Sequence, residues 1–209
     1  MRLACRRSTG RHSRHNHIND ILQRAFNSAG VLSTREPLGL CTQGKRPDGI
    51  TSVPWHKGRC LAWDATCPDT FAQSHVQSSS VSAGAAAAAA ELKKRNKYSD
   101  MPPHIDFTPV AIDTSGVWGE DARDLIKELG RRIALVQLEP RSTSFLRQRI
   151  SLAIQRGNSF CIQARDKQYE VIFFVIPIVG RCCLAYIVVI SSVDCVIEYL
   201  NFYFNLMFI

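Results

Sequence analysis

The sequence predicts an α/β or α+β domain over residues 13–160, with a mixed sheet flanked by helices and a hydrophobic tail over 161–209. Helical and strand-like apolar patterns alternate through the first part of the chain. Hydrophobic residues make up 45% of the sequence, which is enough for a core. Polar sequence gives way to nearly continuous apolar sequence from residue 170 onward.

The first expected element is a helix over residues 14–29. Its apolar side chains recur at helical spacing and form one stripe: Ile18, Ile21, Leu22, Ala25, Phe26 and Ala29. Ser13 is the expected N-cap, and Gly30 is expected to end the helix. Residues 31–38 then form a short expected strand that carries Glu36.

A hairpin is expected next, with strands over 49–55 and 59–66 that turn at 56–58. The later expected elements are a loop over 67–82, a helix over 83–98, a strand over 105–113, and helices over 119–136 and 142–156. The alanine run and its charged end predict the helix over 83–98. Pro109 predicts that its strand lies at an edge of the sheet or contains a bulge.

The hydrophobic tail allows several interpretations. Residues 171–190 reach the ~20 residues that a membrane span needs. Pro177, Gly180 and Arg181 lie in the middle of this stretch, and a central Arg costs ~2.5–3.5 kcal/mol on insertion scales. The alternatives are a buried or misassembled tail, or translated non-coding sequence that does not belong to the domain.

Charge and cysteine content bound the partners and the compartment. Residues 1–60 hold 11 Lys or Arg and 3 Asp or Glu, which equals the +8 net charge of the whole chain. A basic excess in one region favours a polyanionic partner, and a solvated basic tail is the alternative. The 8 cysteines include no CxxC pair, and the first residues lack the apolar run of a secretory signal. We therefore expect free thiols in a reducing compartment.

Two carboxylates lie at the hairpin. If the turn centres on Lys57, Asp64 faces Ile50, and Asp48 lies just beyond it at the same end of the sheet. Trp63 then points to the opposite, buried face. Carboxylate oxygens are the ligands that Mg²⁺ prefers, and a bound Mg²⁺ activates water for attack on a phosphodiester.

Further groups complete the predicted site. Glu36 is the candidate third carboxylate, and Lys94 and Lys97 lie three residues apart on one helix face, where they could stabilise phosphate charge. Structural interpretations compete. Asp48 could begin a turn, Glu36 could pair with Arg35 or Arg46, and the lysines could form a solvated face. An unpaired Asp64 inside the apolar LAWDAT strand would be costly, which favours a functional role.

These motifs carry a family resemblance. RPDG and LAWDAT together resemble the motif of the restriction-endonuclease-like superfamily of the PD-(D/E)XK type. The order RHN, EP, KRPDG, WDATCPDT and KRNKY is similar to the endonuclease domain that follows the reverse transcriptase in some non-LTR retrotransposons. QRISLAIQRGN, residues 148–158, also resembles the end of such polyproteins. The resemblance covers about residues 3–160 and implies a restriction-endonuclease-like core.

The resemblance implies roles for particular residues. Asp48 and Asp64 would bind Mg²⁺, and Lys94 or Lys97 would be a catalytic lysine displaced onto the helix, because Thr66 stands where the simple motif has Lys. The nucleic-acid contacts would come from basic residues near the hairpin and on the helices: Arg14, His15, Lys45, Arg46 and Lys93. Residues 1–12 form a basic segment that would hold the remnant of a zinc knuckle, and the ligands that could remain in or just after it are Cys5, His12, His15 and His17.

The sequence leaves three hypotheses. The first is a Mg²⁺-dependent endonuclease domain, derived from a retrotransposon, that nicks DNA in the nucleus without a small-molecule cofactor. The second is a degenerate remnant that binds DNA, or RNA, without cutting it. The third is a small membrane-anchored protein that uses residues 171–190. The chain contains no Tyr/Phe-x-Asp-Asp box, so it is not a complete retrotransposon polyprotein.

Overall fold

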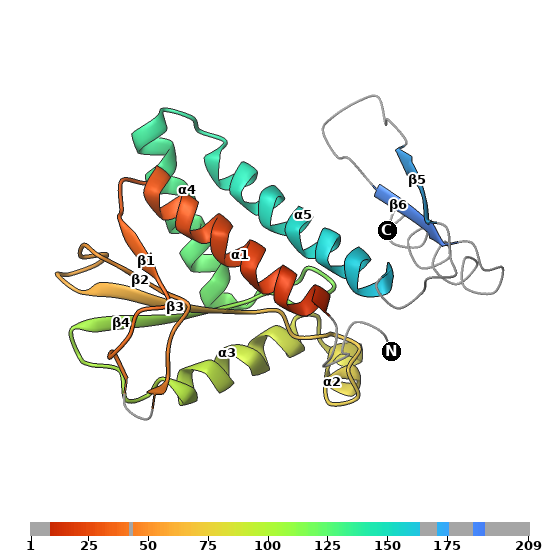
Figure 1. Cartoon of the computed structure of the whole chain (residues 1–209), viewed down its shortest axis with the longest axis horizontal. Coiled ribbons are helices and arrows are strands. Elements are labelled where there is room, and N and C mark those ends of the chain that lie inside the picture. The colour runs from red at the N-terminus through yellow and green to blue at the C-terminus, as the bar shows by residue number, and fades with distance from the viewer. Residues whose placement is uncertain (1–8, 42–43, 164–170, 176–185, 191–209) are drawn as a thin grey trace. The chain divides into compact units, whose positions relative to one another are not determined.

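The computed structural model describes residues 9–41, 44–163, 171–175 and 186–190 (Figure 1). The chain divides into two compact units, Met1–Cys161 and Ile162–Ile209. The first unit contains the helices α1 Thr9–Ser28, α2 Val76–Val81, α3 Ala85–Lys97, α4 Glu120–Gln137 and most of α5 Ser142–Gln163, together with the strands β1 Ser33–Arg35, β2 Gly49–Thr51, β3 Cys60–Thr66 and β4 Ile105–Ala111. The second contains β5 Val171–Val175 and β6 Tyr186–Ile190.

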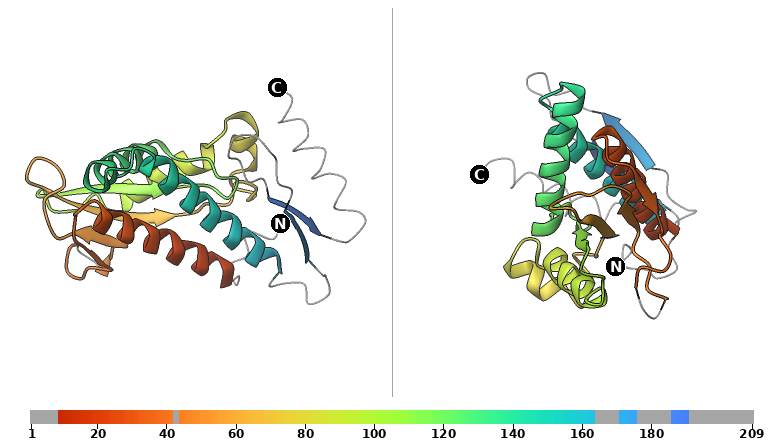
Figure 2. Two further views of the ribbon diagram at one scale, coloured as in Figure 1. Left: turned by 90° about the horizontal axis from the view of Figure 1, so that it is seen from above. Right: turned by 90° about the vertical axis from the view of Figure 1, so that its left-hand side faces the viewer.

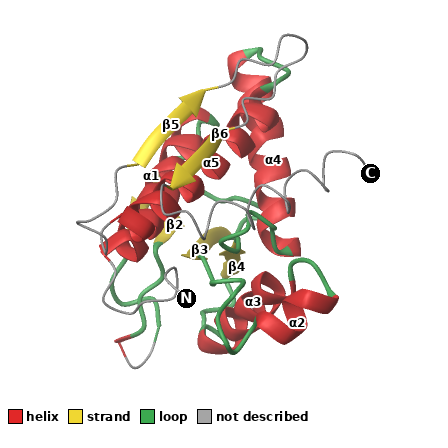
Figure 3. Ribbon diagram, turned by 90° about the vertical axis from the view of Figure 1, so that its right-hand side faces the viewer, coloured by secondary structure: helices red, strands yellow, loops and turns green. Residues whose placement is uncertain are grey.

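The first unit is a mixed α/β structure with a four-stranded sheet in the order β1-β2-β3-β4. The pairs β1–β2 and β2–β3 are antiparallel, whereas β3 and β4 run parallel. Helices α1, α4 and α5 lie over one face of this sheet, and α3 lies over the other (Figures 1 and 2). The expected mixed sheet flanked by helices is therefore confirmed. Figure 3 shows β3 and β4 between α4 and α3.

The expected apolar stripe of α1 forms the centre of the core. Ile18, Leu22 and Phe26 are at most 1% exposed. The Phe26 ring stacks on Trp63 of β3 at a centroid distance of 4.7 Å. Gly30 ends the helix as expected, with a φ of +72° that favours glycine. The helix already includes Thr9, so the predicted N-cap at Ser13 is wrong: Ser13 lies inside the helix, where its hydroxyl contacts His17 at 3.4 Å.

The hairpin forms, but its register differs from the predicted one by two residues. Ile50 pairs with Ala62 rather than with Asp64. The cause lies after β2, where the Thr51 hydroxyl accepts a hydrogen bond from the Leu61 N–H in place of a backbone carbonyl and donates to the Val53 carbonyl. The extra residues are absorbed there as in a bulge. A register shift of two residues leaves each side chain on the face of the sheet that was predicted for it. Asp64 and Trp63 therefore still point to opposite faces.

The later elements largely follow the sequence patterns. Pro109 lies in β4 at the edge of the sheet, as predicted. The predicted loop over 67–82 contains the short helix α2, and α5 continues to Gln163 instead of ending at 156. Gly84, with a φ of +83°, precedes α3, and Ala86 and Ala87 in the first turn of this helix are buried.

The second unit is described only at its two strands. β5 and β6 pair antiparallel, and both lie within the segment for which a membrane span was one interpretation. Among the residues that the structure describes, no helix is both long enough and apolar enough to cross a bilayer. Cys5 of the predicted knuckle remnant lies outside the described residues.

Candidate metal and phosphodiester site

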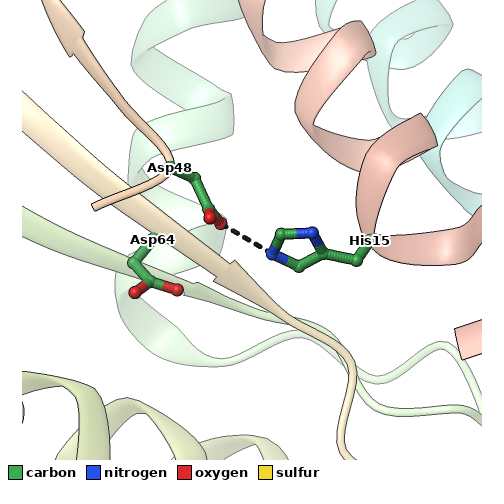
Figure 4. Close-up of side chains that lie close together, drawn as sticks. All are labelled: His15, Asp48 and Asp64. Carbon is green, nitrogen blue, oxygen red and sulfur yellow. Dashed lines mark hydrogen bonds and ion pairs between the residues drawn. The ribbon is translucent and has the colours of Figure 1, made fainter. Parts of the chain in front are cut away.

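Three side chains from separate segments lie close together at one end of the sheet, with His15 and Asp48 pointing toward one another (Figure 4). His15 comes from α1, Asp48 from the residue before β2, and Asp64 from β3. One nitrogen or oxygen of each lies within 4.8 Å of the others. The two carboxylates were predicted to approach one another. The imidazole was predicted to contact nucleic acid, and the structure instead brings it to the carboxylates.

Asp48 is held by three donors that all contact its Oδ2. The His15 Nε2 lies at 2.9 Å, the Asn19 amide Nδ2 donates at 3.0 Å and the Ala65 backbone N–H donates at 2.7 Å. The Asp48 backbone N–H also donates to the Trp63 carbonyl at 2.9 Å. Both the main chain and the carboxylate are therefore anchored, so this residue has little freedom to turn away from the site.

The glycine in the Pro-Asp-Gly motif has a packing reason. A Cβ at Gly49 would lie 2.1 Å from the Trp63 ring. The indole therefore lies directly against the backbone that follows Asp48. Its Nε1 donates to the Asn19 Oδ1 at 3.1 Å. A single close packing contact thus fixes both the carboxylate and the amide that binds it.

Asn19 is a site residue that the sequence reasoning missed. It is 0% exposed, accepts from Trp63 and donates to Asp48. The available signal was its spacing: it lies one helical turn after His15 and next to Ile18, on the buried stripe of α1. A polar side chain in that stripe must find buried partners, and these are the site residues themselves.

His15 and Asp48 shift each other's pKa. The hydrogen bond to Asp48 raises the pKa of His15 above 6.5, although burial acts to lower it. Burial acts to raise the pKa of Asp48, but the hydrogen bond and charge of His15, with the amide of Asn19, outweigh it and bring the value below 3.8. Each group therefore favours the charged form of the other.

Asp64 is 2% exposed and is surrounded by donors from the end of α3. The Lys94 ammonium contacts Oδ1, the Lys97 ammonium lies 3.5 Å from Oδ2, and the Tyr98 hydroxyl donates to Oδ2 at 2.5 Å. Lys94 or Lys97 was predicted to supply a cation near the carboxylates, and both ammonium groups contact Asp64. An otherwise costly buried carboxylate is compensated by these contacts.

Tyr98 is the second residue that sequence reasoning missed. Its hydroxyl also lies 2.7 Å from the Arg46 carbonyl, in the loop that leads to Asp48. Burial, and then the hydrogen bond to Asp64, raises the pKa of the Tyr98 phenol. The group therefore stays a neutral hydroxyl at neutral pH and links the two carboxylate-bearing segments. Its only sequence signal was its position directly after Lys97.

Glu36, the predicted third carboxylate, lies outside this cluster. It follows β1 with a φ of +49°, and its side chain is 58% exposed. The carboxylate pairs with Arg46 at 3.2 Å, which is the structural interpretation that the sequence left open. Only its backbone N–H takes part, by donating to the Asp48 carbonyl at 2.9 Å. His15 holds the place that was expected for Glu36.

Arg14 requires the clearest correction among the predicted nucleic-acid contacts. It is 1% exposed, and its Nη1 donates to the Asn158 Oδ1 at 2.8 Å and lies 3.3 Å from the Cys161 Sγ. A Cβ at Gly157 would lie 1.8 Å from its Cγ. Arg14 therefore joins α1 to α5 inside the unit and does not reach the surface on which DNA would bind.

The other predicted nucleic-acid contacts lie at the surface. Lys45 pairs with Asp100 at 3.1 Å, Arg46 pairs with Glu36, and Lys93 is exposed on α3. Surface pairs of this kind exchange readily with water and ions. A polyanion could therefore recruit these cations at a small energetic cost.

Comparison with known protein-family models and with curated proteins finds no match for this chain. The motif resemblance to restriction-endonuclease-like domains therefore stays a prediction.

Proposed function

We propose that this chain contains a Mg²⁺-dependent endonuclease domain of the restriction-endonuclease-like class, derived from a non-LTR retrotransposon, that nicks DNA phosphodiesters. The observation that supports this most is the convergence of Asp48, Asp64 and Lys94. They come from three different segments, and Lys94 is 30 residues from Asp64. Two carboxylates and an ammonium at one point are the groups that metal-assisted phosphodiester hydrolysis needs.

The donor set fits a divalent cation. The carboxylates of Asp48 and Asp64 offer hard oxygen ligands within 4.8 Å of one another. Asp48 and Asp64 would hold the ion. When bound, the ion would supply a polarised water and neutralise charge on the phosphate. The rigid attachment of Asp48 to Ala65 and Asn19 keeps one ligand in place before the ion arrives.

The remaining groups have separate roles in this proposal. Lys94, whose side chain is 23% exposed, can turn from Asp64 toward a phosphate oxygen and stabilise negative charge there. Lys97 and Tyr98 contact Oδ2 and would keep the Asp64 carboxylate oriented while Oδ1 faces the ion. The cations of Lys45, Arg46 and Lys93 would bind the DNA backbone by displacing counterions.

The test is nicking of supercoiled plasmid by the full chain, with MgCl₂ or with EDTA. We expect nicking with MgCl₂ alone, and Asp64→Asn should remove it while the folded structure persists. Glu139→Gln is the matched control, because Glu139 forms an exposed ion pair with Arg141 away from the site residues. Full activity in Asp64→Asn, or activity in EDTA, would contradict the proposal.

A second candidate function is DNA binding without cleavage. One observation favours it: protein cations already pair with both carboxylates, His15 with Asp48 and the two lysines with Asp64. Such a closed network needs no metal for charge balance. Under this function, DNA affinity would fall steeply with salt and would be unchanged by Asp48→Ala, with no nicking under any metal condition.

A further inference from the structure

The third group at the candidate metal site is an imidazole. The His15 Nε2 lies 2.9 Å from the Asp48 Oδ2, and both belong to the three-residue cluster with Asp64. Neighbouring ligands on one ion lie roughly 3 Å apart when metal–ligand bonds are roughly 2.0–2.2 Å. The present separation of nitrogen and oxygen therefore already matches that of two adjacent ligands.

A buried amide orients the Asp48 carboxylate and lies against the imidazole. The Asn19 Nδ2 lies 3.0 Å from the Asp48 Oδ2 and 3.3 Å from the His15 Nε2. Its own Oδ1 is fixed by the Trp63 Nε1, and Asn19 is 0% exposed. Metal ligands are commonly held in this way by a second layer of hydrogen bonds that sets ring and carboxylate orientation. The imidazole is thus part of a built arrangement and not a mobile surface group.

We propose that His15 is the third metal ligand and that the site therefore binds a first-row transition ion, with Mn²⁺ as the probe, more tightly than Mg²⁺. This inference rests on the proposed metal site and specifies its selectivity. Mg²⁺ prefers oxygen ligands, whereas imidazole nitrogen favours transition ions. A site of two carboxylates and one imidazole offers ligands that suit both ions. The imidazole nitrogen then accounts for the difference between the affinities for Mn²⁺ and Mg²⁺.

The test measures metal binding directly, without DNA. Calorimetric titration of the full chain with Mn²⁺ and with Mg²⁺ gives the two affinities, and pulsed electron paramagnetic resonance of bound Mn²⁺ detects a coordinated ¹⁴N nucleus. We expect at least about tenfold tighter binding of Mn²⁺ and a clear ¹⁴N coupling. His15→Ala should weaken Mn²⁺ binding by at least about tenfold, weaken Mg²⁺ binding less, and remove the coupling.

Two further variants make the result specific. His17→Ala is the matched control, because His17 lies on the same helix and is exposed, and it should leave both affinities and the coupling unchanged. His15→Gln keeps a side chain that can donate to Asp48 but lacks the imidazole, so it should fold and still lose the coupling. Absence of the coupling in the unmutated chain would overturn the assignment even if a variant misfolds.

The outcomes separate this inference from the proposed function. Binding of Mn²⁺ without ¹⁴N coupling, equal loss of both ions in His15→Ala, or no Mn²⁺ binding at all would overturn the assignment of His15. If nicking depends on Asp64 but bound Mn²⁺ shows no ¹⁴N coupling, the endonuclease is supported and His15 is rejected as the third ligand. Coupling without any nicking would support the ligand set and reject the endonuclease.

Discussion

The ring of Trp63 occupies the space that a side chain at Gly49 would fill, because a Cβ there would lie 2.1 Å from the indole. This contact lies directly beside Asp48, and the same indole donates to Asn19. The Pro-Asp-Gly motif is therefore bound to the buried tryptophan of β3 by packing as well as by sheet hydrogen bonds.

Gly49→Ala should destabilise the first unit by about 1–3 kcal/mol, because the added methyl group overpacks the indole. Denaturant unfolding of the full chain measures the change. The matched background is Trp63→Phe, which leaves more room beside position 49. The same substitution should cost clearly less in that background, and an equal cost in both would contradict the contact as its cause.

Asn19→Ala should cost about 1–3 kcal/mol of unfolding free energy, because it leaves the Trp63 Nε1 without its acceptor and removes one of the three donors to the Asp48 carboxylate. The near-ultraviolet signal of tryptophan should change in the native state. Asn27→Ala, at an exposed position of the same helix, is the control and should change stability by less than about 0.5 kcal/mol. Equal effects of the two variants would exclude the proposed role of the buried amide.

Substitutions of Arg14 and Lys93 should distinguish a structural role from a role in nucleic-acid binding. Arg14→Ala should lower the free energy of unfolding by about 2–5 kcal/mol, since it opens a cavity beside Gly157 and removes the hydrogen-bond donor to the Asn158 Oδ1. Lys93→Ala should leave stability nearly unchanged and reduce the slope of log affinity for DNA against log salt by about one. Unfolding curves and salt-dependent DNA titrations distinguish the two. A change of the salt slope in Arg14→Ala with little loss of stability would contradict the burial of Arg14.

The His15–Asp48 pair should give a stability difference that depends on pH. The pKa of His15 is raised above 6.5, so its stabilising contribution is complete below that value and is lost as pH rises through the folded-state pKa. The pKa of Asp48 lies below 3.8, so its contribution is present above 3.8 and is lost as pH falls through its folded value. His15→Gln should therefore destabilise more at about pH 5.5 than at about pH 9, measured by unfolding in EDTA. A pH-independent difference would contradict the pair.

The sequence predicted those features that depend on residues close together in the chain. The stripe of α1 follows from helical spacing, and the placement of Lys94 and Lys97 on one face of a helix follows from the same spacing. The choice between Glu36 and His15 was not accessible from sequence. It depends on where α1 crosses the sheet, which is set by the stacking of Phe26 on Trp63.

Long-range packing accounts for the other differences. The sequence alone suggests that Arg14 is a surface cation. In the folded chain, Gly157 of α5 lacks a side chain and so leaves space for the aliphatic part of Arg14. The register of the hairpin depends on the Thr51 hydroxyl, which replaces a backbone acceptor for Leu61. Neither relationship leaves a periodic signal, because each depends on a single partner that only the folded chain brings near.

The central claim is that Asp48 and Asp64 share one divalent ion that serves phosphodiester cleavage. Its most direct test is the Mg²⁺-dependent nicking rate of the full chain beside that of Asp64→Asn. We expect measurable nicking that falls by at least about 100-fold in the variant, since the metal contributes several kcal/mol to the transition state. Folded, DNA-binding protein that shows no metal-dependent nicking, or nicking at the same rate in both chains, would contradict it.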